Sequence, residues 1–150
     1  MDRFAQILYD LGKEMDLDLY PDPNRICQLN YHDELHIQIH FDEIKEEIII
    51  ACFLCEIPPG RYREKLLRAA LISNNDYPRV GTLSYSEKNN KLTLVEKVYA
   101  PNMPSAKLHQ IMQDFFDKGK TWKEAVEKGG LLPVQPSNKN SGGSMFGMKP

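Results

Sequence analysis

The sequence has little of what would mark a nucleic-acid binder or a membrane protein. Its 150 residues hold 19 Lys and Arg against 21 Asp and Glu, and no cluster of four or more basic residues is interleaved with aromatics, so nucleic acid is not an expected partner. No apolar stretch approaches the roughly 20 residues that span a bilayer, so we expect no membrane insertion. Asp2 and Arg3 stand where a signal peptide would have a basic region, which leads us to expect a cytoplasmic protein.

Cysteine is scarce too. Three cysteines, an odd number, fit reduced thiols better than a disulfide framework. Cys52 and Cys55 have the CxxC spacing of redox and zinc sites. In a regular strand, however, residues i and i+3 face opposite sides and their Cα atoms lie about 10 Å apart. We therefore expect buried thiols and no catalytic site at this pair.

The chain also lacks a site for a metal, a nucleotide or another cofactor. His36 and His40 share one face of an expected strand, but about 13 Å would separate them, which is too far for one metal ion with bonds near 2 Å. No glycine-rich phosphate loop and no nucleophile elbow are present. We expect no cofactor and no enzymatic activity.

Hydrophobic periodicity and turn residues predict one α+β domain over residues 1–130, followed by a tail at 131–150 rich in Pro, Ser, Gly and Asn that we expect to be disordered. The fold class is αβββαββα, a twisted antiparallel sheet with helices packed on it. The expected elements are a helix at 2–19, strands at 26–31, 35–41 and 48–55, a helix at 61–73, strands at 80–85 and 91–99, and a helix at 104–128.

The strand at 48–55 is apolar at every position between Glu47 and Glu56. Because side chains alternate along a strand, both of its faces need cover. The first and last helices can cover one face. The residues leave open whether the other face is covered by the middle helix, by a second copy of the chain or by a ligand chain.

Several segments together resemble the class I type III secretion chaperones of the CesT/Tir chaperone family. They are the opening amphipathic helix, the three strands, 66–71 running to Asn74 and Asn75, the hairpin of 81–85 and 91–94, and a final helix with Phe115, Phe116 and Trp122. The resemblance implies a cytoplasmic bacterial homodimer that is not an enzyme. Such a protein binds the N-terminal segment of secreted effectors, keeps it export-competent, and has secretion-apparatus components as further candidate partners.

The resemblance also implies roles for particular side chains. The helix at 61–73, with the strand at 80–85, would form the dimer interface through Leu66, Leu67, Ala70, Leu71, Val80, Leu83 and Tyr85. Core and client-binding grooves would share Phe4, Leu8, Leu11, Met15, Ile37, Ile39, Ile50, Cys52 and Leu54. The residues do not decide which of this second group belong to a groove, since an apolar helical stripe is more often core.

Two other functions remain as alternatives. One is a YbjN-like regulatory or structural protein that binds a folded component on the same scaffold. The other is a small thiol enzyme that uses Cys52 and Cys55.

Overall fold

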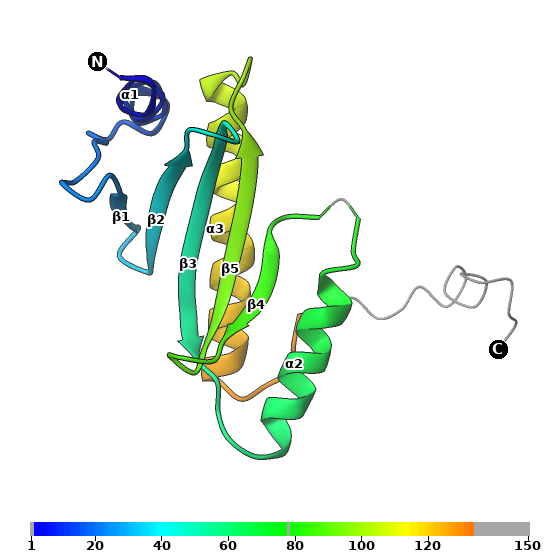
Figure 1. The fold of residues 1–150 in the computed structure, drawn as a ribbon. Helices are drawn as coiled ribbons and strands as arrows, with labels where there is room; N and C mark the ends of the chain where they lie inside the picture. Colours follow the sequence, from blue (N-terminus) through cyan, green and yellow to red (C-terminus); the bar gives the residue numbers. More distant parts are fainter. Residues whose placement is uncertain (1, 78, 134–150) are drawn as a thin grey trace, which may run out of the picture.

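The computed structural model describes residues 2–77 and 79–133, which form three helices and one antiparallel sheet (Figure 1). The elements are α1 (Arg3–Met15), β1 (Cys27–Tyr31), β2 (Leu35–Asp42), β3 (Glu47–Glu56), α2 (Arg61–Ser73), β4 (Thr82–Ser86), β5 (Lys91–Tyr99) and α3 (Ser105–Glu127). This order confirms the expected α+β class. The expected tail lies outside the described residues from position 134 onward.

The sheet has the strand order β1-β2-β3-β5-β4, with every neighbouring pair antiparallel. β3 is the central strand, and its register places Ile50 opposite Ile39 of β2 and Glu96 of β5. β1 and β4 form the two edges. The strand with the longest apolar run in the sequence therefore has a partner strand on each side.

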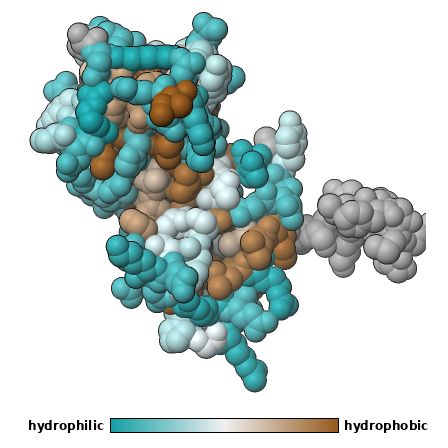
Figure 2. All heavy atoms as spheres, in the orientation of Figure 1, coloured by the Kyte–Doolittle hydropathy of each residue, from teal (hydrophilic) through white to brown (hydrophobic). Residues whose placement is uncertain are grey.

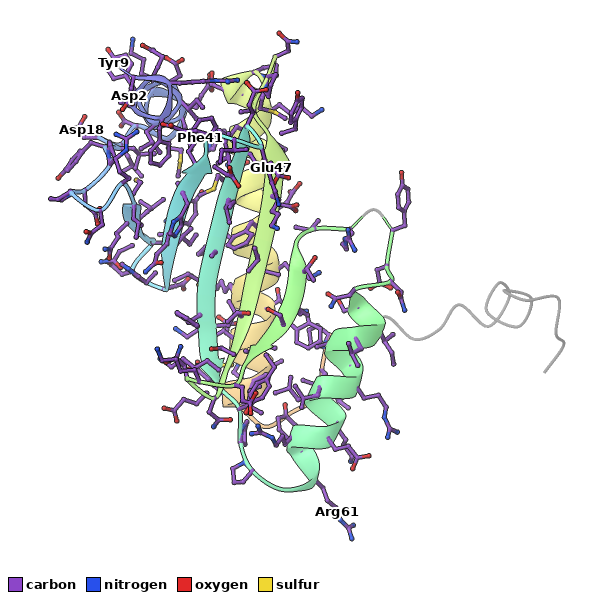
Figure 3. The ribbon with its side chains drawn as sticks, in the orientation of Figure 1. Asp2, Tyr9, Asp18, Phe41, Glu47 and Arg61 are labelled. Carbon is purple, nitrogen blue, oxygen red and sulfur yellow. The ribbon has the colours of Figure 1, made fainter. Side chains whose placement is uncertain are left out.

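Two of the three helices cover one face of the sheet. α3 packs against β2 and β3, and α1 packs against α3. Phe41, at the end of β2, stacks on Phe4 of α1 with 6.0 Å between ring centroids (Figure 3). α3 approaches the sheet closely at Gly119, where a Cβ atom would lie 2.9 Å from the Leu35 side chain. The core lies between these helices and the sheet.

α2 does not cover the opposite face of β3. It lies beside the edge strand β4, and the other face of the central strands is left open (Figure 1). The Tyr62 hydroxyl holds the start of α2 to the end of α3, with its single O–H shared between the Ala125 carbonyl at 3.2 Å and the Gly130 carbonyl at 3.1 Å. The middle helix therefore does not cover the second face of the strand at 48–55.

Two expected boundaries are wrong by more than one residue. α1 ends at Met15 and does not reach residue 19, because Asp16 adopts a left-handed conformation (φ 56°) and its N–H bonds back to the carbonyls of Gly12 and Lys13. β4 begins at Thr82, two residues later than expected, because Gly81 (φ 65°) turns the chain away from β5.

No helix in the described ranges is both long enough and apolar enough to cross a membrane.

Candidate functional site

The described residues contain no cluster of three or more His, Cys, Asp or Glu side chains that could hold a metal ion. His36 instead lies within an amide network, where its Nδ1 is 2.8 Å from Asn30 Oδ1 and its Nε2 is 3.0 Å from Gln28 Oε1.

The expectation that Cys52 and Cys55 face opposite sides is wrong. The register shifts between Phe53 and Cys55, so that Cys52 lies opposite Leu94 and Cys55 lies opposite Leu92. Directly opposed residues point to the same side, and both leucines are buried in the core. A β-bulge at this point therefore turns both thiols toward the helices.

The shared orientation does not make the thiols reactive. Both are free, and burial raises the pKa of Cys52 and of Cys55 to about 11. A reactive thiol needs a lowered pKa and access to solvent. The expectation of unreactive thiols therefore rests on burial and not on their separation.

The open face of the sheet carries an apolar surface at its centre. Phe53 is 49% exposed there, flanked by half-buried Ile49 and Ala51 of β3 and Val95 of β5. Figure 2 shows hydrophobic side chains over this part of the sheet. This is the second face of the apolar run 48–55, and no element of the described chain covers it.

A hollow of about 500 Å³ lies on this open face. Its lining comes from four strands and combines apolar, hydroxyl and amide side chains with an imidazole, a thiol and the charged Lys91. The lining residues are His36, Gln38, Ala51, Cys52, Phe53, Ser84, Tyr85, Ser86, Lys91, Thr93 and Val95. The Ser84 and Thr93 hydroxyls bond to each other across β4 and β5. The hollow combines an apolar floor with hydrogen-bonding groups at its rim, which suits an amphipathic peptide.

Two further hollows meet at Leu17, after the end of α1. One of about 690 Å³ includes Tyr9 and Tyr20, and one of about 310 Å³ includes Met15 and His109. Tyr9, Leu17 and Tyr20 are exposed. In Figure 3 the Tyr9 side chain projects from α1 on the side away from β3 and β5. These hollows form a second surface, in which apolar side chains stand among charged ones such as Lys13 and Asp16.

Eight of the nine residues expected to be shared between core and groove are buried in the protomer. Only Met15 is partly exposed. The buried eight are Phe4, Leu8, Leu11, Ile37, Ile39, Ile50, Cys52 and Leu54. These eight side chains support the surface from the core and are not exposed on it.

The seven residues expected at a dimer interface divide between core and surface. Leu66, Ala70 and Leu83 are buried, and Leu67 and Val80 are half-buried. Leu71 is 69% exposed and Tyr85 is 37% exposed. A shallow hollow of about 440 Å³ runs along α2 past Leu67 and Leu71. The exposed apolar stripe of α2 is thus the part of this prediction that another chain could contact.

Phe53, Leu17 and Tyr20 were not among the expected site residues. Phe53 belongs to the outward-facing half of the apolar strand, so the alternation along 48–55 contained the signal for it. Leu17 lies in the segment expected to be helical and Tyr20 directly follows it, and both are exposed after the early end of α1.

Comparison with known proteins gives a family and a fold. The model of the family described as "Tir chaperone protein (CesT) family" matches residues 6–123. No curated protein matches the sequence significantly.

Several solved structures share the fold. A chain of the HopA1–SchA chaperone–effector complex is 18% identical, with a TM-score of 0.66 over 81% of this chain and 94% of that one. A chain of the ExsC–ExsE complex is 14% identical, with a TM-score of 0.70 over 84% and 97%. A chain of the ExoU–SpcU complex from the type III secretion system of Pseudomonas aeruginosa is 12% identical, with a TM-score of 0.63 over 83% and 98%.

Proposed function

Because this chain belongs to the Tir chaperone protein (CesT) family, we propose that it is a type III secretion chaperone of the bacterial cytoplasm. It binds the N-terminal segment of secreted effector proteins and keeps that segment competent for export. Proteins with its fold are seen in complex with effectors, as in the HopA1–SchA chaperone–effector complex. The protein acts by binding and catalyses no reaction.

The observation that carries this proposal is the uncovered apolar centre of the sheet. Phe53, Ala51 and Val95 form the floor of a hollow of about 500 Å³. An extended client segment can place alternate apolar side chains on this floor, while its main chain bonds to hydroxyl and amide groups at the rim. Recognition of this kind requires few particular residues in the client, which suits a partner that is held without being folded.

The hollows around Leu17 provide a second contact for the same client. Met15 lines one of them, and a methionine side chain adapts its shape to different partners. Cys52 lies at the base of the open-face hollow, but its side chain is buried. Of the nine predicted client-binding residues, Met15 alone is partly exposed, and the other eight support the surface from the core.

Self-association through α2 accompanies this function. Leu71 and the half-buried Leu67 lie one turn apart on α2, and Ile72 beside them is also exposed. An apolar helix stripe of this kind, on a helix whose main sheet contact is β4, suits a symmetric contact with the same stripe of a second copy. We propose a homodimer with Leu67 and Leu71 at its centre and Tyr85 and Val80 at its border.

Co-expression with candidate effectors tests the function. Each effector is truncated to about its first hundred residues, and co-purification is measured for the wild type, Phe53→Gln and Ile44→Gln. Phe53→Gln should weaken capture about tenfold, because burial of the exposed part of a Phe side chain contributes about 1–2 kcal/mol. Ile44, 95% exposed on the β2–β3 turn, is the matched control and should leave capture unchanged.

Two results would count against the proposal. If none of the truncated segments co-purifies and only intact folded domains do, the protein is a partner of folded components instead. If Phe53→Gln captures its client as well as Ile44→Gln does, the open face is not the client-binding surface.

A further inference from the structure

β5 continues beyond the end of its neighbour β4. β4 spans Thr82–Ser86, and its pairing with the longer β5 ends where Thr82 lies opposite Val95. Figure 1 shows β5 extending past β4 on that side of the sheet. The last part of β5, up to Tyr99, therefore has a partner strand on one side only.

The direction of the main-chain groups along this part of β5 follows from one hydrogen bond. The Ala100 N–H donates to the Glu46 carbonyl at 2.8 Å, in register with the β3–β5 ladder. Because main-chain groups alternate in direction along a strand, Val98 and Glu96 also face β3. Lys97 and Tyr99 then direct their N–H and C=O groups to the opposite side, in line with β4. Within residues 2–77 and 79–133, no hydrogen bond partner is found for these four groups.

Gly81 explains why the chain itself leaves this edge. Its N–H donates to Glu96 Oε2 at 2.7 Å, and its positive φ of 65° turns the preceding residues away from β5. A Cβ atom at this position would lie 2.9 Å from the Leu94 side chain, so glycine is needed for the turn. The contacts of Gly81 with Glu96 and Leu94 thus fix Thr82 as the first residue of β4.

The outer side of β4 is occupied at Leu83. The Asn74 side chain pairs with both main-chain groups of Leu83 on the outer side of β4, at 2.8 Å each. On the helix side, a hollow of about 300 Å³ lies between α3 and the segment after α2, with Val80, Lys118 and Trp122 in its lining. Val80 precedes Gly81, whose N–H bonds to the Glu96 side chain, so this hollow lies near the last part of β5.

We infer that an extended segment of the client adds to the sheet as a short strand beside β5, pairing with the main chain of Lys97 and Tyr99. This inference rests on the proposed function and names the edge that takes the client. The segment would continue the line of β4. Its side chains would alternate between the open face, near Tyr99, and the hollow beside Lys118.

Proline substitution tests the main-chain contact directly. In Lys97→Pro the lost N–H is one that does not bond to β3, so the ladder within the protomer stays intact, and proline is tolerated at such an edge. The matched control is Lys88→Pro. Lys88 is the second residue of the turn closed by the Asn90 N–H and the Glu87 carbonyl, a position that favours proline. The probe is the effector segment that co-purifies with the wild type.

Lys97→Pro should weaken binding of this segment about tenfold or more, while Lys88→Pro binds as the wild type does. Equal binding by the two folded variants overturns the inference. If Lys97→Pro does not fold, hydrogen exchange of the wild type decides. The Lys97 and Tyr99 amides should exchange fast in the free protein and become protected in the complex, and fast exchange in the complex also overturns it. Failure of the wild type to bind any segment would instead refute the proposed function.

Discussion

The side chain of Asn74 pairs with the main chain of Leu83 as a neighbouring strand would. Its Nδ2 donates to the Leu83 carbonyl and its Oδ1 accepts the Leu83 N–H, both at 2.8 Å. One residue at the end of α2 thus holds the helix to the sheet and occupies the outer edge of β4.

Asn74→Ala should lower the free energy of unfolding by about 1–3 kcal/mol, because it leaves two partly buried main-chain groups without partners. Asn75→Ala is the matched control, since Asn75 is exposed and lies next along the same turn. Urea unfolding of both variants measures the difference. Equal stability of the two would show that water replaces the Asn74 amide at no cost.

The turn between β1 and β2 stores strain that glycine would relieve. His32 (φ 51°) and Asp33 (φ 56°) occupy the centre of a turn closed by the Glu34 N–H and the Tyr31 carbonyl, and both have the positive φ of a type I′ hairpin. Asp33→Gly should stabilise the protein by about 0.5–1 kcal/mol and raise Tm by about 2–4 °C. Asp33→Ala should not raise Tm, and a Tm that rises equally for both variants would refute the explanation.

Leu71→Asp should convert a dimer into a monomer without loss of fold. The Leu71 side chain is 69% exposed in the protomer, so its charge would be solvated in the monomer and buried only in the dimer. Light scattering should give about twice the 17.3 kDa chain mass for the wild type and about the chain mass for the variant. Ile44→Asp, on the remote β2–β3 turn, should remain a dimer. A wild type that is monomeric at micromolar concentration would contradict the proposed dimer.

Alkaline pH should destabilise the protein through its buried thiols. The pKa of Cys52 and of Cys55 is raised to about 11 by burial, against an ordinary value of 9.0. In the unfolded chain these thiols ionise first, so their contribution to stability is complete below about pH 9 and is lost as the pH rises toward about 11. Urea unfolding between pH 8 and pH 11 should show this decline.

The double variant Cys52→Ala with Cys55→Ala is the comparison for that decline. It should lose less stability over the same pH range, whatever its stability at pH 8. An unchanged pH dependence would mean that other groups are responsible.

The sequence predicted the elements well because hydrophobic periodicity and turn residues are local signals. The helix at 61–73 and the strand at 91–99 have the expected bounds. The early end of α1 follows from a local cap at Asp16, but two other errors arose where one contact distant in sequence decided the outcome. The hydrogen bond from Gly81 to Glu96 delays the start of β4 to Thr82, and the bulge before Cys55 depends on the register with Leu92 and Leu94. Neither contact leaves a pattern in the local sequence.

The candidate site was predicted less well than the fold. Apolar alternation identified both faces of β3, but it could not tell which face the helices would cover. The residues first selected were therefore mostly those of the buried face, such as Ile50 and Leu54, and not Phe53 of the open one. Helix position relative to the sheet is a tertiary property that a single strand does not encode.

The central strand β3 carries core residues and open-face residues in alternation. From Ile48 to Phe53, every second residue contributes to the core and every other one to the open face. A mutational scan along β3 should therefore oscillate with a period of two, with folding defects alternating with binding defects. At the bulge this alternation should be interrupted, so that substitutions of Leu54 and of Cys55 both impair folding. The interruption would locate the bulge from mutational data alone.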